Sequence, residues 1–141
     1  MKMSGLSSDI PISTSPTALF FASGGDIYID NVIFESGATG LAGGTTLELI
    51  ASETQGLSVF FANAVSGLGA NTTLDMFTAS TKQRTVIQNG TYVSIGSTGA
   101  KCTGSGVWIL TVIYRPCGVE SAILSPYAAF IPLVNNPPSP V

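Results

Sequence analysis

The sequence predicts a single all-β domain, folded as an antiparallel sandwich or jelly roll of about eight short strands. Runs of β-branched and aromatic residues recur at spacings of roughly 8–14 residues, and clusters of Gly, Asn and Ser separate them. No segment keeps the helical period of about 3.6 residues over a helical length. At 141 residues the chain can bury one hydrophobic core and is short for two domains.

The first two strand candidates are 18–21 and 26–35. The second changes parity along its length, because its large apolar side chains are Ile27, Ile29, Val32 and Phe34. An odd step inside an alternating run predicts a β-bulge, which we place near Asp30–Asn31.

Three further candidates are, in order, 46–50, 57–62 and 73–77. In the first of these, Leu47 and Leu49 alternate with other residues and are expected to point inward, after a turn at Gly43-Gly44. Within the middle candidate, 58–62 could hide a short helix, as could 122–124, because periodicity cannot settle so short an apolar run.

The clearest local signal is a β-hairpin predicted over 85–95. Its two β-rich arms are joined by Asn89-Gly90. Asn-Gly is the pair that best tolerates the positive φ angles of a type I′ turn, which is the common turn of two-residue hairpins.

The run 107–114 is the most apolar strand candidate and lies between Gly106 and Arg115. We expect a central strand that is buried on both faces, because β-branched and apolar residues occur at both parities. Trp108 and Tyr114 share one face of this strand. They could form a ligand shelf if exposed, but core packing is the better interpretation.

Cys102 and Cys117 flank this run. One straight strand at about 3.3 Å per residue separates its ends by on the order of 25 Å. A disulfide needs Cα atoms within about 7 Å. We therefore expect no bridge within the chain, and two buried thiols. The chain has no His, so neither thiol is expected to bind a metal.

Both ends differ in composition from the predicted domain, which spans 17–131. Residues 1–16 are rich in Ser and Pro, and residues 132–141 are rich in Pro and lack charged side chains. We interpret 1–16 as an N-terminal arm and 132–141 as a Pro-rich C-terminal arm, which order along neighbouring subunits. Disordered termini are the alternative.

The surface is predicted to be poor in charge. Charged residues make up 9% of the chain, against about 25% in an average soluble domain. Hydrophobic residues make up 45%, and the mean hydropathy is +0.44. Because charge keeps proteins apart in solution, this composition indicates permanent burial in an assembly. A monomer with a hydroxyl-rich surface is the alternative.

Several partner classes are not expected. The net charge is −3 and the cations are scattered, so no basic stripe could neutralise a nucleic-acid backbone. No apolar run approaches the length of about 18 residues that a membrane helix needs. The first residues turn polar at once, which predicts no secretory signal and synthesis in the cytoplasm.

Catalysis is not expected either. Without His, the chain lacks Ser-His-Asp and Cys-His sites, and its carboxylates are too dispersed to nominate an acid pair. Asp26 and Asp30 share a face and could offer two oxygen ligands to Ca²⁺, although solvated carboxylates are commoner. We therefore predict no enzyme activity, no small-molecule substrate, no cofactor and no resident metal.

Three segments carry a resemblance to a known family: DNVIF at 30–34, GLAGGTTLEL at 40–49 and GSGVWILTVIY at 104–114. In their style of strand and turn they resemble jelly-roll cement, or decoration, proteins of tailed-phage heads. The resemblance implies a homotrimer on the capsid exterior, bound to the major capsid protein and to its own copies. It also implies that 1–12 and 132–141 clamp neighbouring capsomers.

The contact residues that this role assigns lie in the two arms. They are Ile10, Pro11, Ile12, Pro132, Leu133, Asn135, Asn136, Pro137 and Pro138. Two other functions stay open. One is a carbohydrate- or receptor-binding module of a fibre or cell surface, and the other is a self-assembling shell or pilus subunit.

Overall fold

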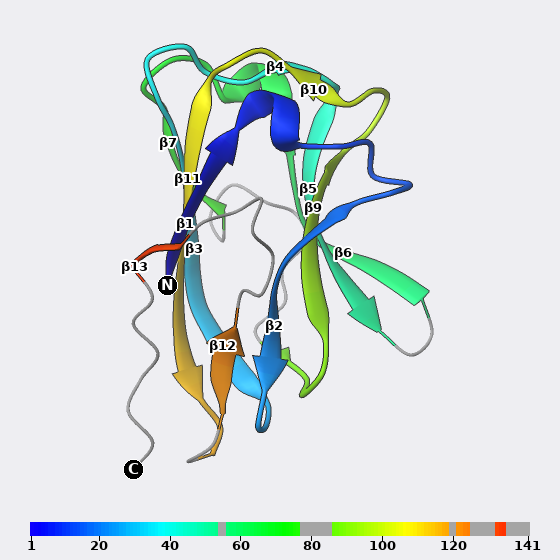
Figure 1. Ribbon diagram of the computed structural model, residues 1–141, viewed down its shortest axis with the longest axis vertical. Helices are drawn as coiled ribbons and strands as arrows, with labels where there is room; N and C mark the ends of the chain where they lie inside the picture. The colour runs from blue at the N-terminus through cyan, green and yellow to red at the C-terminus, as the bar shows by residue number, and fades with distance from the viewer. Residues whose placement is uncertain (54–55, 77–85, 119–120, 125–131, 135–141) are drawn as a thin grey trace.

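The computed structural model describes residues 1–141 except 54–55, 77–85, 119–120, 125–131 and 135–141. Its strands form antiparallel sheets, two of which pack face to face (Figure 1). The all-β sandwich predicted from the sequence is therefore confirmed. None of the helices among the described residues is long and apolar enough to cross a membrane.

The first sheet has the strand order β13-β1-β11-β3-β7, and β8 also pairs with β3. Its strands are β1 (Lys2–Leu6), β3 (Ile27–Ser36), β7 (Thr73–Asp75), β8 (Val86–Ile87), β11 (Val107–Pro116) and β13 (Pro132–Val134).

The second sheet has the order β12-β2-β9-β5-β6. Its strands are β2 (Thr17–Ser23), β5 (Thr46–Glu53), β6 (Gly56–Ala64), β9 (Tyr92–Ser97) and β12 (Ala122–Leu124). Segments 58–62 and 122–124, for which a short helix was the alternative, are thus strands. A small ribbon of β4 (Ala42–Gly43) and β10 (Cys102–Thr103) closes one end, with the 3-10 turns η1 (Ser7–Asp9) and η2 (Val65–Gly67).

The pairing pattern is that of a jelly roll. Early strands pair with late ones in nested order: β1 with β11, β2 with β9, β3 with β7 and β8, and β5 with β6. When this nested ribbon folds over itself, alternate pairs fall into opposite sheets. The pairing of β11 with β3 then completes the first sheet, and the pairing of β9 with β5 completes the second. Strands β12 and β13 add one outer strand to each sheet.

One core lies between the two sheets. Its largest fully buried side chains include Trp108, Phe34, Phe20 and Phe61, and Leu47 and Leu49 point inward as predicted. The Trp108 ring stacks on Phe34 with centroids 5.7 Å apart. Its indole Nε1 donates a hydrogen bond to the Leu6 carbonyl at 3.0 Å, so the one buried polar atom of the ring is satisfied.

The predicted bulge in β3 is confirmed. Ile113 of β11 lies opposite Asn31, whereas the next residue, Tyr114, lies opposite Ile29, so Asp30 is the extra residue. This insertion restores the inward direction of Val32 and Phe34 after Ile27 and Ile29; all four side chains are buried.

The prediction of an N-terminal arm over 1–16 is wrong for the first ten residues. Strand β1 is an inner strand, paired with β11 on one side and β13 on the other. Met3 and Ile10 belong to the core, both with 0% of their surface exposed. The sequence pattern did not predict this strand because Met3 is its one buried apolar side chain. Its backbone pairing with β11 holds the segment in the sheet.

The predicted hairpin over 85–95 is also wrong. Strands β8 and β9 belong to different sheets, so the turn between them carries the chain across the sandwich. Thr91 N donates to Gln88 O at 2.9 Å, which closes the turn. Only Gly90 of the central pair has a positive φ, of 81°. A type I′ turn needs positive φ at both residues, and positive φ at the second alone fits a type II turn.

Strand β11 is central in its sheet, as predicted, but it is not buried on both faces. Trp108, Leu110 and Val112 point into the core, whereas Val107 and Ile113 each have 45% of their surface exposed. Among the described residues, no further sheet packs on the outer face of β11. Trp108 is therefore a core residue, in agreement with the interpretation drawn from the sequence.

The two cysteines are free thiols and do not form a bridge, as expected. Cys102 is buried, but Cys117 is exposed, so the expectation of two buried thiols is wrong for Cys117. Cys117 directly follows β11, and its backbone N–H donates a hydrogen bond to the Asp26 carbonyl at 3.0 Å.

Candidate assembly interface

The outer side of the first sheet carries a cluster of exposed apolar side chains at its centre. We call this cluster the apolar face; its residues are Leu6, Ile33, Val107, Ile109 and Ile113. Leu6 is 41% exposed and Val107 and Ile113 are each 45% exposed, while the other two are half-buried. Scattered single apolar residues are normal on a surface, but a contiguous group marks an interaction site more often than chance.

The strand register places these residues near one another, with Thr111 between Ile109 and Ile113 along β11. Because directly paired residues point to the same side of a sheet, Leu6 lies beside Val107. In the same way Thr111 lies beside Ile33. The alternation of β11 then aligns its outward residues in one column along the middle of the sheet.

Charged side chains flank the apolar face. Lys2 on β1 and Asp75 on β7 occupy opposite sides of one row, which runs across the sheet through Thr111 and Ile33. Both are exposed. Glu35, half-buried on β3, lies in the adjacent row beside Ile109.

An ion pair and an aromatic ring lie at one end of this face. Arg115 Nε donates to both carboxylate oxygens of Asp30, at 3.0 and 2.9 Å. These bonds raise the pKa of the Arg115 guanidinium, which stays charged at every accessible pH. The guanidinium carbon also lies 5.5 Å from the centre of the Tyr28 ring, a cation–π distance.

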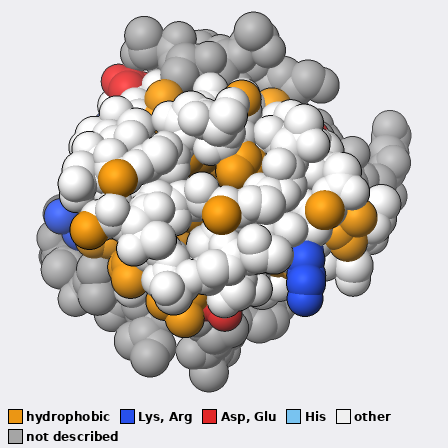
Figure 2. Space-filling view, turned by 90° about the horizontal axis from the view of Figure 1, so that it is seen from above, with side chains coloured by type: hydrophobic (Ala, Val, Ile, Leu, Met, Phe, Trp, Pro, Cys, Tyr) orange, Lys and Arg blue, Asp and Glu red, His pale blue; other side chains and the backbone are white. Residues whose placement is uncertain are grey.

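The loop end around β4 and β10 is nearly free of charge. Figure 2 looks down on it and shows mainly backbone and uncharged polar atoms, with isolated apolar and charged groups. At Gly106 two loops pack too closely for a side chain, because a Cβ there would overlap the carbonyl of Gly40. The buried Ser36 hydroxyl accepts a hydrogen bond from Thr72 N at 3.0 Å and donates to the Gly69 carbonyl, which fixes the loops.

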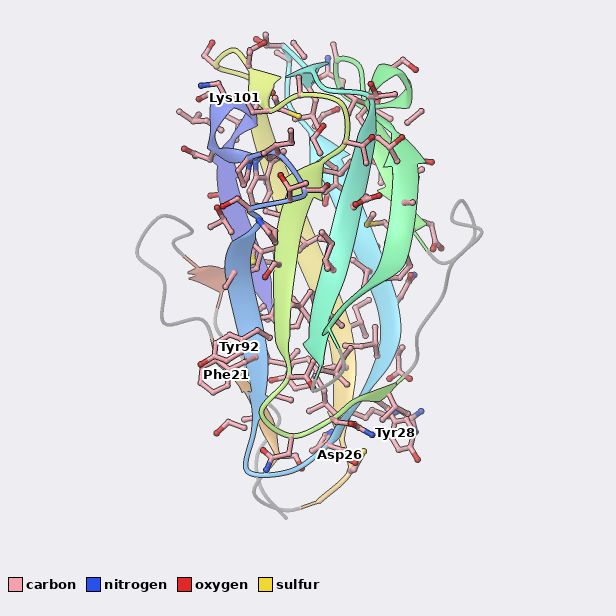
Figure 3. The ribbon with its side chains drawn as sticks, turned by 90° about the vertical axis from the view of Figure 1, so that its right-hand side faces the viewer. Phe21, Asp26, Tyr28, Tyr92 and Lys101 are labelled. Carbon is pink, nitrogen blue, oxygen red and sulfur yellow. The ribbon has the colours of Figure 1, made fainter. Side chains whose placement is uncertain are left out.

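A pair of aromatic rings lies on the outer side of the second sheet. The centroids of Phe21 and Tyr92 are 5.1 Å apart, at an interplanar angle of 35°. Figure 3 shows the two rings side by side near the end of the sandwich opposite Lys101. Tyr92 is 38% exposed, so one ring of the pair reaches solvent.

Among the predicted contact residues whose side chains the structure describes, Ile10, Pro11 and Ile12 differ in exposure. Ile10 has no exposed surface, so its assignment as a partner contact is wrong in this fold. Ile12 is 38% exposed and forms a bridge to Ser97, with the half-buried Pro11 before it. Pro132 and Leu133 lie in β13. The remaining four, Asn135, Asn136, Pro137 and Pro138, lie outside the described residues.

Sequence reasoning missed the apolar face because it placed 107–114 between two covering layers. Apolar residues at both parities are compatible with a strand buried on both faces and with a strand whose outer face forms an exposed apolar contact surface. Leu6 and Ile33 distinguish the two cases, because they place apolar side chains from the neighbouring strands on the same outer side of the sheet.

The carboxylates considered for calcium are engaged with protein groups. Asp30 binds Arg115, and Asp26 accepts a hydrogen bond from Asn89 N at 2.8 Å. Within the described part of the chain, no three or more His, Cys, Asp or Glu side chains cluster as metal ligands would.

In comparisons with known proteins, no family model matches the chain, and no curated protein or solved structure shows significant similarity to it.

Proposed function

We propose that this chain is a structural subunit of a virion, a cement or decoration protein that stabilises a capsid from outside. The observation that carries the proposal is the apolar face, exposed at the centre of a sheet in a chain of which 9% is charged. The jelly roll supports it, because this architecture recurs in viral capsid proteins, although a fold by itself does not specify a function. The resemblance of 30–34, 40–49 and 104–114 to cement proteins points the same way.

The mechanism is mechanical. Each subunit would bury part of its surface against the major capsid protein and part against its own copies, and a standard interface buries about 800 Å² on each partner. Burial of apolar surface contributes roughly 25 cal/mol per Å² before the cost of association. Many copies on one shell act together, so modest contacts resist expansion of the shell through avidity. No cofactor, nucleic acid or small-molecule substrate takes part.

Binding to undecorated capsids tests the proposal. Purified protein is mixed with undecorated tailed-phage heads, and the bound fraction is measured by co-sedimentation together with the temperature at which the heads rupture. We expect saturable binding and a higher rupture temperature. Val107→Asp should weaken binding at least tenfold, because it places a charge in the apolar face. Ser105→Asp, an exposed change at the loop end, is the matched control and should bind normally.

The same experiment separates cement from a self-assembling shell or pilus subunit. A cement protein alone should stop at a small oligomer, and a shell subunit should form large particles without other protein. The trimer implied by the family resemblance stays a prediction that native mass tests. Absence of binding to every undecorated head, together with a strictly monomeric state, would contradict the assembly function.

Carbohydrate binding is the second candidate, and the Phe21–Tyr92 pair is the observation that favours it. Exposed aromatic rings offer a flat apolar surface of the kind on which ligand rings stack. A glycan array with the wild type and Tyr92→Ala tests this candidate. Specific binding that Tyr92→Ala abolishes would favour the lectin-like function, and no binding by the wild type would reject it.

A further inference from the structure

Asn89 and Gly90 are adjacent and exposed in the turn between β8 and β9. We infer that Asn89 is a site of spontaneous deamidation, and that the folded chain restrains this reaction through hydrogen bonds from the backbone N–H groups of both residues. The modification converts the asparagine into aspartate or isoaspartate, with water as the only other reactant. It is independent of the proposed function, because it depends on this turn and not on the apolar face.

The sequence makes Asn89 the most reactive asparagine of the chain, because it is the one Asn that a Gly follows. In deamidation the backbone nitrogen of the following residue attacks the side-chain carbonyl carbon of Asn. Gly has no Cβ, so its nitrogen is unhindered and its backbone reaches conformations that other residues avoid. Asn71, which precedes Thr72, is the comparison within the same molecule, since a β-branched side chain crowds the nitrogen.

The reaction proceeds through a cyclic imide. The Gly90 nitrogen bonds to Cγ of Asn89, the bond between Cγ and Nδ2 breaks, and Nδ2 leaves as ammonia with the proton of the Gly90 amide. The succinimide ring that results then takes up a water molecule. Cleavage of its bond between Gly90 N and Cγ gives aspartate. Cleavage of its bond between Gly90 N and the backbone carbonyl carbon of residue 89 gives isoaspartate, whose main chain runs through Cβ.

Hydrogen bonds hold both reacting groups in the folded chain. Gly90 N donates to the Ala22 carbonyl at 2.8 Å, so the attacking nitrogen keeps its proton directed toward β2. Asn89 Oδ1 accepts a hydrogen bond from Gly25 N at 3.2 Å, which holds the side-chain amide against the turn between β2 and β3. The attack requires these bonds to open. The reaction therefore proceeds from a locally open state, and it slows as opening becomes rarer.

The Asp26 carboxylate fastens the same turn from the other side of Asn89. Its Oδ1 accepts a hydrogen bond from Asn89 N at 2.8 Å, and a hydrogen bond to a carboxylate stabilises more than one to a neutral acceptor. The backbone carbonyl of Asp26 in turn accepts a hydrogen bond from Cys117 N at 3.0 Å. Figure 3 shows Asp26 at the end of the sandwich opposite Lys101. Asp26 is thus a positioning residue that suppresses the modification of Asn89.

Deamidation rates test both parts of the inference. The full chain is incubated in mildly alkaline buffer, either folded or in guanidinium chloride, and peptide mass spectrometry follows the conversion of Asn89 and Asn71. In guanidinium chloride, Asn89 should convert at least about tenfold faster than Asn71, because Gly leaves the attacking nitrogen unhindered. In the folded chain, Asn89 should convert at least about tenfold more slowly than in guanidinium chloride, because several hydrogen bonds must open first.

Variants of Asp26 test its part in the restraint. Asp26→Ala should accelerate conversion in the folded chain about tenfold, because Asn89 N loses its acceptor. Asp26→Asn keeps an uncharged acceptor oxygen and should lie between Asp26→Ala and wild type. The matched control is Asp9→Ala, which should leave the Asn89 rate unchanged. Asp9 is also exposed and its Oδ2 also accepts a backbone hydrogen bond, from Leu6 N at 2.8 Å, but it lies in η1 at the opposite end.

In guanidinium chloride every variant should convert at the wild-type rate, since the hydrogen bonds are then absent. Tryptophan fluorescence checks that each variant is folded, because Trp108 is the single Trp of the chain and is buried. If Asp26→Ala fails to fold, Asp26→Asn provides the comparison with wild type.

Three results would overturn the inference, and none of them bears on capsid binding. If the folded wild type converts as fast as the denatured chain, the fold does not restrain the reaction. If folded Asp26 variants convert at the wild-type rate, Asp26 has no part in the restraint. If Asn89 converts no faster than Asn71 in guanidinium chloride, Asn89 is not the reactive site.

Discussion

Replacing Met3 by Ala distinguishes an integrated N-terminal strand from an arm. The Met3 side chain is fully buried among the core residues of the sandwich. Removing a buried Met side chain costs about 2–5 kcal/mol, from lost transfer free energy and from the cavity left behind. We expect a loss of about 2–3 kcal/mol, because neighbouring side chains can fill part of the space.

The matched control is Ser4→Ala. Ser4 is the next residue of β1 but points outward beside Ile109, so its loss should change stability by less than about 0.5 kcal/mol. Urea unfolding followed by Trp108 fluorescence measures both variants, at one fixed protein concentration so that any self-association contributes equally. Equal midpoints for Met3→Ala and wild type would refute the integrated strand and return 1–16 to the status of an arm.

Three further predictions follow from single contacts. Gly106→Ala should lower the free energy of unfolding by about 1–3 kcal/mol, because its Cβ would overlap a neighbouring backbone carbonyl. Gly90→Ala should lower it by at most about 1 kcal/mol, because the space around Gly90 is open and only its positive φ is unfavourable for Ala. Thermal unfolding measures both variants. Burial raises the pKa of the Cys102 thiol and the Tyr114 hydroxyl above their ordinary values of 9.0 and 10.0, so the folded state retains protons that the unfolded chain has released. Stability should therefore fall as the pH rises above about 9, and Tyr114→Phe should flatten the upper part of that decline in urea midpoints. In the native state a thiol reagent should label Cys117 quickly and Cys102 only after unfolding; rapid labelling of both would contradict the burial of Cys102.

The parts of the fold that could be predicted are those that local pattern determines. Alternation in 46–50 gave the inward direction of Leu47 and Leu49, and the parity change in 26–35 located the bulge at Asp30. In each case one face of the strand meets the core, so a shift of one residue would expose the whole apolar set. The pattern is therefore strict enough to be visible without the structure.

The parts that could not be predicted depend on partners distant in sequence. Strand β1 holds a single buried side chain, and it is a strand because β11, more than a hundred residues later, pairs with it. The turn at Asn89-Gly90 was predicted correctly as a turn, but the sheet that each flank joins is set by β3, β2 and β5. A jelly roll is rich in such non-local pairs, and local sequence carries little information about them.

Strand β11 takes part both in the core of the fold and in the proposed assembly contact, and it does so with opposite faces. Inward, Trp108 stacks on Phe34 and hydrogen-bonds Leu6, so the strand ties β1 and β3 into one core. Outward, Val107 and Ile113 contact solvent in a single copy and contribute little to its folding free energy. Apolar residues at such positions lower the solubility of a free chain, and burial against another protein, as the proposed function requires, would remove that cost. The outward face can therefore change without altering the core, which is the physical basis for testing assembly and folding with separate substitutions on one strand.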